Sequence, residues 1–144
     1  MHIIREIHII VSMIEINNKT RSKINIALVK HVAEKFLNYY KINKNISIAF
    51  VGDTVIKKLN KNYRGKDKIT DILSFDGEGE DLGEIVINYM QIKRQSQKYS
   101  KTVQDELVFI LVHGLLHLIG YDDQTEKTRK VIIKKGEDFI KKFL

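Results

Sequence analysis

The sequence predicts an α+β domain with a mixed, mostly parallel four-stranded sheet, an antiparallel hairpin at its edge and about five helices. Apolar residues alternate or run together in four short segments, which is typical of strands. In five longer segments they recur at helical spacing. The segments follow one another in the order β-α-β-α-β-β-α-α-α, which predicts one mixed sheet with helices on its faces.

The first half of the chain predicts alternating strands and helices. A strand is expected at residues 13–16, where a short alternation ends in a polar Asn-Asn turn. Residues 1–12 either lengthen this strand or form an N-terminal extension outside a single domain of residues 13–144. An amphipathic helix follows from about 22 to 40, with Ser22 or Thr20 as its cap.

A second strand, a second helix and a charged loop are expected next. Residues 46–51 read as a strand, and Asp53 or Thr54 is expected to cap a helix that runs to Tyr63. A loop dense in charge then covers residues 63–71. Strands joined through helices in this way should pair in parallel.

A hairpin and three helices complete the prediction. The strands 72–75 and 82–88 are joined by a short polar turn, so they should pair antiparallel. Helices are expected at 89–98, from Thr102 to about Gly120, and from Thr125 onward. The lysines of the last helix are expected to be solvated.

Composition limits the classes of function. The 144 residues include no cysteine, so disulfides and thiolate ligands are excluded and a cytoplasmic location is expected. No apolar stretch is long enough to span a bilayer. The formal net charge of +7 favours polyanions, with nucleic acid ahead of anionic membranes.

The helix that begins at Thr102 carries the sequence's clearest chemical pattern. It is apolar on nearly every side, so it should be buried at the centre of the domain. His113 and His117 are four residues apart and project from one face. Gly120 would end the helix, and Asp123 lies six residues after the second histidine, far enough to fold back toward the pair.

Two imidazoles and one carboxylate, with a position left open for water, are the ligands of a catalytic zinc-type site. Together with Gly120, the three candidate ligands have the spacing of the long metalloprotease signature His, His, Gly, His, with Asp123 in place of the last His. The glutamate that serves proteases as general base is replaced by Gly114, which argues against peptide hydrolysis. Asp122 is the neighbouring alternative ligand. Alternatively, the two histidines are ordinary hydrogen-bonded helix residues and Gly120 only ends the helix.

Two separated stretches together resemble one family. Residues 59–75, which include Arg64 and the motif Thr-Asp-Ile-Leu-Ser-Phe, and residues 113–123 are similar to the bacterial YbeY proteins. Residues 83–87 resemble the next strand of that family, and the resemblance covers about residues 13–142. The family consists of metal-dependent endoribonucleases that act in ribosomal RNA maturation.

The resemblance implies a single-strand-specific endoribonuclease that matures the 3′ end of 16S rRNA and serves ribosome quality control. It implies one divalent metal ion per chain, with zinc expected and nickel, cobalt or iron as alternatives. The implied ligands are His113, His117 and, where the family usually has a third His, Asp123.

The resemblance also makes Arg64 the arginine important for activity. Arg64 would bind a phosphate together with Lys66 and Lys68. A salt bridge from Arg64 to Asp67 or Asp71 is the structural alternative. The expected partners are single-stranded ribosomal RNA, the small ribosomal subunit and its assembly factors, without DNA or membrane. A non-catalytic, metal-stabilised assembly factor is the competing function, and a metalloprotease-like hydrolase comes third.

Overall fold

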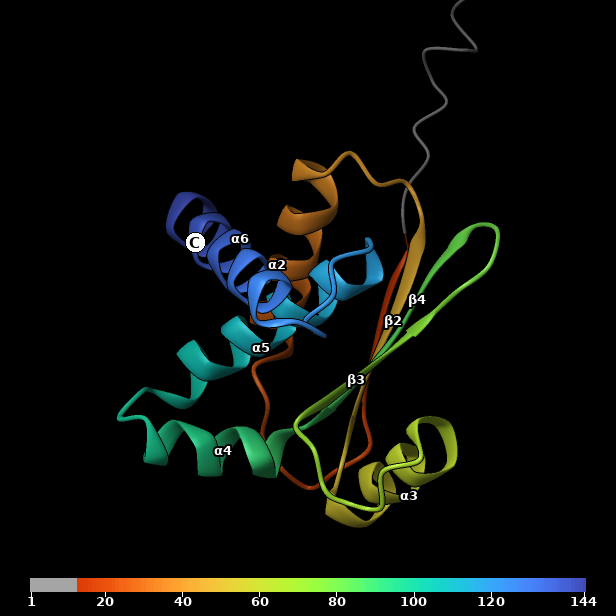
Figure 1. Cartoon of the computed structure of the whole chain (residues 1–144), viewed down its shortest axis with the longest axis vertical. Coiled ribbons are helices and arrows are strands. Elements are labelled where there is room, and N and C mark those ends of the chain that lie inside the picture. The colour runs from red at the N-terminus through yellow and green to blue at the C-terminus, as the bar shows by residue number, and fades with distance from the viewer. Residues whose placement is uncertain (1–12) are drawn as a thin grey trace, which may run out of the picture.

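A four-stranded mixed sheet organises the molecule. The computed structural model describes residues 13–144, so the predicted extension at 1–12 lies outside the described residues. The sheet order is β1-β2-β4-β3, with parallel β1–β2 and β2–β4 pairs and an antiparallel β3–β4 pair at one edge (Figure 1). This confirms the predicted topology. The strands are β1 (Ile14–Asn18), β2 (Asn45–Val51), β3 (Ile72–Asp76) and β4 (Asp81–Asn88).

Five helices pack around this sheet in the described part of the chain. They are α2 (Ile26–Tyr39), α3 (Asp53–Arg64), α4 (Tyr89–Lys98), α5 (Val103–Leu118) and α6 (Glu126–Phe143).

The alternation of side chains along β4 assigns each helix to a face of the sheet. Ile85 and Ile87 belong to the main core with α2, α5 and α6. Val86 points the other way and forms a smaller core with Ile56 of α3. Residues 13–144 therefore form three layers, and of their helices only α3 covers the second face of the sheet (Figure 1).

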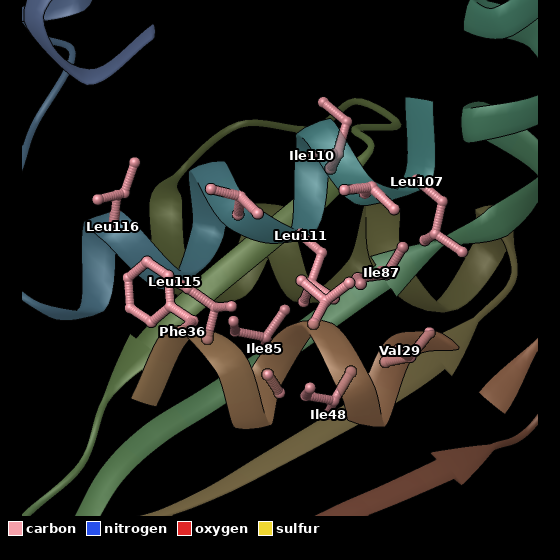
Figure 2. Close-up of a cluster of buried hydrophobic side chains, with 14 of the residues drawn as sticks. Val29, Phe36, Ile48, Ile85, Ile87, Leu107, Ile110, Leu111, Leu115 and Leu116 are labelled. Atoms are coloured by element: carbon pink, nitrogen blue, oxygen red, sulfur yellow. The ribbon is translucent and has the colours of Figure 1, made fainter. Parts of the chain in front are cut away.

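Helix α5 lies at the centre of the main core, as predicted. Leu111 and Leu115 are fully buried between Phe36 of α2 and the isoleucines of the sheet, as Figure 2 shows. Burial of one such leucine stabilises the fold by about 1.5–3 kcal/mol. A helix enclosed in this way is a rigid support for any side chain that leaves it toward solvent. Among residues 13–144, no helix is long and apolar enough to cross a membrane.

The predicted start of α2 was wrong. Asn25 is its cap, and the Asn25 Oδ1 accepts a hydrogen bond from the Leu28 amide at 3.0 Å. Thr20 instead donates its hydroxyl to the side chain of Asn18 at 2.7 Å, in the turn after β1. A threonine used by that turn is not available to cap a helix that starts six residues later.

The predicted cap of α3 was wrong as well. Gly52 occupies the cap position and no side chain caps the helix. Asp53 is the first helical residue, and its carboxylate accepts hydrogen bonds from Arg94 at 2.6 Å and from Asn88 at 2.7 Å. Asp53 thus joins α3 to α4, while still placing a negative charge in the first turn of its helix.

Both ends of α5 match the prediction. The Thr102 hydroxyl accepts from the Asp105 amide at 3.0 Å. At the other end, the Gly120 amide donates to the His117 carbonyl at 3.0 Å, and the next amide reaches Leu116. This is a Schellman turn, and Gly120 has a φ of 108°, which favours glycine. The turn sends the following residues back across the end of the helix.

Candidate metal centre

An open cleft of about 860 Å³ lies between the exposed side of α5, the loop after α3 and the connection from α5 to α6. Of the residues singled out in the sequence, Arg64, Lys66, Lys68, His113, His117, Asp122 and Asp123 all line it. Segments that are about 50 residues apart in the sequence therefore meet at one site.

The two histidines and Asp123 form a triangle of donor atoms. The Nε2 atoms of His113 and His117 are 3.1 Å apart, and the Asp123 Oδ2 lies 3.4 Å from the first and 3.5 Å from the second. Among residues 13–144, these three are the one group whose ligand atoms converge in this way. The predicted convergence is thus present.

The size of this triangle fits a first-row metal ion. Zinc binds nitrogen and oxygen at about 2.0–2.1 Å, so two donors of a tetrahedral ion lie about 3.3–3.4 Å apart. All three observed separations lie close to this value. The side chain of Asp123 is 45% exposed, so the triangle faces the cleft and leaves a fourth position open.

The surroundings of His113 favour its neutral form. Burial lowers the pKa of this imidazole, and the neighbouring His117 lowers it further, whereas Asp123 and Asp71 raise it. A neutral imidazole keeps a lone pair on one nitrogen, which is the form that binds a metal. The fold therefore favours the protonation state of His113 that the donor triangle needs to bind a metal.

Between the two histidines, Gly114 allows strand β3 to approach the helix. A Cβ added to Gly114 would lie 2.5 Å from the Ile72 Cδ1 and 3.2 Å from the Ser74 Oγ. The position that carries the catalytic glutamate in the protease signature is therefore filled by the sheet. This gives a structural reason for the absence of a protease-type base.

The Asp123 carboxylate, not that of Asp122, completes the triangle. The Asp122 Oδ1 accepts the Gln124 amide at 3.1 Å. This hydrogen bond, followed by one from Thr128, lowers the pKa of Asp122, whose charge supports the start of α6. The two neighbouring carboxylates thus have separate tasks, one structural and one facing the histidines.

Arg64 lies at the last turn of α3, on the wall of the cleft. Its Nη2 donates to the Ser74 backbone carbonyl, and its guanidinium lies 5.0 Å from the centre of the Phe75 ring. The described residues include no ion pair from Arg64 to Asp67 or Asp71, so that alternative was wrong. The side chain is exposed, and its other N–H groups remain for an anionic ligand.

A buried asparagine fixes the loop that carries the cationic side chains. Asn60 is 3% exposed, and its Nδ2 donates to the Lys68 carbonyl at 3.0 Å. Gly65 ends α3 with a φ of 70° and starts the loop. Lys66 and Lys68 are themselves exposed, so they can move within a loop whose backbone is held at both ends.

The sequence prediction missed a polar network beside the metal centre. The Gln95 amide donates to Asp71 at 3.2 Å and to Glu106 at 2.8 Å, and Glu106 also accepts from Lys101 at 3.1 Å. Glu106 is 3% exposed and Asp71 lines the cleft. A glutamate in an otherwise apolar helix was the one available signal, since a buried charge needs a partner.

The prediction also missed contacts from α6. The Arg129 Nη2 lies 3.5 Å from the backbone carbonyl of Asp123, and Arg129 and Ile133 line the cleft. Tyr121 lines it as well. Their helical spacing gave no indication of which side of α6 would turn toward the histidines.

Comparisons with known proteins identify the family of the chain. The family model described as "Endoribonuclease YbeY" matches residues 12–144. A protein named endoribonuclease YbeY from Geobacillus sp. (strain WCH70) is 34% identical over 145 residues, which cover 90% of this chain and 92% of that protein. Its counterpart from Thermodesulfovibrio yellowstonii is 46% identical over 101 residues, covering 66% of this chain and 64% of that protein.

A solved structure has the same fold. The solution structure of a Thermotoga maritima protein aligns with a TM-score of 0.63 and 28% identity, covering 89% of this chain and 87% of that one. The family model spans the cleft, the histidine helix and the sheet that supports them. The chain therefore belongs to the endoribonuclease YbeY family.

Proposed function

We propose that the cleft is the active centre of a metal-dependent endoribonuclease that cleaves single-stranded RNA. The observation that carries this proposal is the triangle of His113, His117 and Asp123 donors at tetrahedral spacing in a cleft that also holds Arg64. Family membership supports RNA as the substrate. The natural substrate we propose is the 3′ region of 16S rRNA, encountered on the small ribosomal subunit and among its assembly factors.

We assign the metal to these three side chains, with zinc as the expected ion and nickel, cobalt or iron as alternatives. A bound ion of this kind acts as a Lewis acid on a phosphate oxygen and lowers the pKa of a coordinated water. Asp123 supplies an anion where the family usually has a neutral imidazole. The added negative charge should make the site a weaker acidifier of water than a three-histidine site.

Arg64 is the proposed catalytic residue of the chain itself. Its contacts with the Ser74 carbonyl and the Phe75 ring hold the guanidinium at the wall of the cleft. The remaining N–H donors can form a planar fork on a phosphate and stabilise negative charge that grows on it.

We assign Lys66 and Lys68 to binding of the RNA backbone. Their role is electrostatic, because exposed ammonium groups attract phosphates without reading sequence.

The test compares wild type with His117→Ala and Arg64→Ala on a single-stranded ribosomal RNA fragment. The first variant should lose both bound metal and cleavage. The second should keep the metal and lose about 100-fold or more in turnover, as when a donor to a developing oxyanion is removed. Metal content is measured by mass spectrometry of the purified protein. Cleavage by both variants at the wild-type rate would refute the assignment.

A second experiment separates catalysis from a scaffold role. If the protein is a non-catalytic assembly factor, a metal-free His113→Ala variant should restore 16S rRNA processing in depleted cells. If cleavage is the function, that variant should fail although it is folded and present at the normal level. The folded state of the variant can be checked by circular dichroism.

A further inference from the structure

A second concave surface, the α2–α6 groove, lies between the last turn of α2 and the side of α6 from Lys130 to Phe143. It has a volume of about 600 Å³, and ten residues line it. The two helices meet through aromatic contacts, because the ring centres of Phe36 and Tyr39 of α2 lie 5.4 Å and 5.9 Å from that of Phe139 of α6; both helices are labelled in Figure 1. The lining residues are Tyr39, Tyr40, Lys130, Val131, Lys134, Lys135, Asp138, Phe139, Lys142 and Phe143.

The groove and the metal cleft lie on opposite sides of one helix. Arg129 and Ile133 of α6 line the cleft, whereas the α6 residues of the groove include Lys134, Asp138 and Lys142. With 3.6 residues per turn, these two sets project in nearly opposite directions. The same helix therefore forms a wall of both depressions.

Four aromatic residues, Tyr39, Tyr40, Phe139 and Phe143, line the groove, and Tyr39 is the most exposed of them. Tyr39 is 46% exposed although it packs edge-on against Tyr40 and lies 4.7 Å from the Phe143 ring. Phe139 lies beneath, with its ring centre 5.9 Å from that of Tyr39. The Tyr39 plane is inclined by 55° to 87° to those of Tyr40, Phe139 and Phe143, so the Tyr39 ring alone offers the face on which a nucleobase can stack.

Lysines surround these rings. The Lys142 Nζ lies 5.6 Å from the centre of the Tyr39 ring and 5.4 Å from that of Phe143. Lys134 is paired with Asp138 at 2.9 Å, which is the one acidic residue of the lining. Lys130 is paired with Glu126, just outside the lining, at 3.4 Å, so the excess of positive charge comes from Lys135 and Lys142. Aromatic rings with interleaved cations match bases and phosphates together, not a purely apolar partner.

Lys135 connects the groove to the metal cleft. It lines the groove, and its Nζ lies 5.6 Å from the centre of the Tyr121 ring. Tyr121 lines the cleft. A strand of RNA that leaves the cleft past Tyr121 would thus meet a cation and then the aromatic floor of the groove.

We propose that the α2–α6 groove binds single-stranded RNA that flanks the segment held in the metal cleft. This inference rests on the proposed endoribonuclease function for the identity of the ligand. It revises the expectation that the lysines of α6 are only solvated, because Lys135 and Lys142 lie against aromatic rings. The groove would contribute affinity for longer substrates without taking part in bond cleavage.

Binding is measured by fluorescence anisotropy on the metal-loaded protein, with a labelled 2′-O-methyl uridine 12-mer and within the time for which gel electrophoresis shows the RNA to be intact. Tyr39→Ala should weaken binding about tenfold without changing its salt dependence, because a stacking surface is lost. The association constant falls as salt rises, and Lys142→Gln should make the plot of its logarithm against log salt less steep by about 0.7, the value for one phosphate contact on a single strand. Since no cleavage is needed, this result does not depend on the nuclease assignment.

The matched control is Lys98→Gln on α4, where the lysine also lies beside an exposed aromatic ring, 5.5 Å from the centre of Tyr99. It should leave both affinity and salt slope unchanged. A 12-mer that contains 4-thiouridine should cross-link to peptides that hold Tyr39 or Phe143. Cross-links confined to the cleft, together with unchanged binding by Tyr39→Ala, would overturn the proposal. A dimer that Tyr39→Ala dissociates would overturn it too, by identifying a second copy as the occupant.

Discussion

The Ser74 Oγ of β3 donates a hydrogen bond to the backbone carbonyl of Gly114 in α5, at 3.3 Å. The contact forms at the first of the three residues that lie between His113 and His117 in the sequence. It joins the edge strand of the hairpin to the helix of the metal centre. Because Arg64 is bonded to the backbone of the same serine, Ser74 connects the cationic and the metal-binding sides of the cleft.

A glutamate at position 114 should not convert this protein into a protease. Gly114→Glu would force β3 away from α5, because even a Cβ meets the Ile72 side chain at 2.5 Å. Overpacking and a buried charge together should lower the free energy of unfolding by about 3 kcal/mol. The control is Gly136→Ala in α6, where the nearest atoms are 3.7 Å away. Gly136→Ala should raise the free energy of unfolding by about 0.5–1 kcal/mol. Urea titration of wild type and both variants measures these differences.

The third ligand can be tested by two substitutions. Mutation of a residue that only hydrogen-bonds to a metal ligand typically weakens metal binding by about 10–100-fold. Asp123→Ala should weaken it by more, because it removes a donor atom itself. Asp123→His should retain the ion, because imidazole is an equally suitable zinc ligand. Competition with a chromogenic chelator gives both affinities. Unchanged affinity in Asp123→Ala would show that the carboxylate is not a ligand.

Asn60 should act on RNA cleavage through the loop and not through the metal. Asn60→Ala removes the buried donor to the Lys68 carbonyl and should cost about 1–2 kcal/mol of stability. Because Arg64 and the loop lysines would lose their fixed backbone, kcat/KM for RNA should fall about tenfold while metal content stays the same. Asn62→Ala, an exposed position on the same helix, is the matched control and should change neither quantity.

Acid should weaken the connection between α3 and α4. Hydrogen bonds from Arg94 and then Asn88 hold the pKa of Asp53 below its usual value. A carboxyl whose pKa is depressed by folding contributes stability above its unfolded pKa of about 3.9, and loses it as the pH falls through the folded value.

The comparison is between wild type and Asp53→Asn, with the free energy of unfolding measured from pH 6 to pH 2. The difference should stay constant above about pH 5 and shrink below about pH 4. It should not exceed about 1 kcal/mol, because the Arg94 side chain is 46% exposed. In an Arg94→Gln background the pH-dependent part should become smaller. A difference that grows toward low pH would contradict the assignment.

Much of this fold could be predicted because local pattern and tertiary structure agree. Helix α5 is apolar on nearly every side, and the hairpin follows from two strands around a short polar turn. The caps of α2 and α3 could not be predicted, because several polar residues stood near each start. Thr20 donates a hydrogen bond from its hydroxyl to Asn18, and Asp53 accepts one from Arg94. These contacts form only in the folded chain, and neither side chain caps a helix.

The site shows the same division. His113, His117 and Asp123 could be predicted from spacing along one helix and its turn. The polar network through Gln95 and the approach of Arg129 depend on how α4 and α6 dock, which periodicity does not specify. The sequence thus indicated the three candidate donor residues. The residues that surround them were identified only from the packing of the helices.

The position of Asp123 between α5 and α6 ties ion uptake to the integrity of the C-terminal helix. Two donors come from α5 and the third from the short connection that leads into α6, so an ion in the triangle acts as a clasp between them. Any ligand that binds only the folded state adds to its stability, by an amount that grows with the logarithm of its free concentration once that exceeds the Kd. Starvation for the ion would then lower the free energy of unfolding of a protein whose 18-residue last helix follows directly on the third donor, and in a cell would shorten its lifetime.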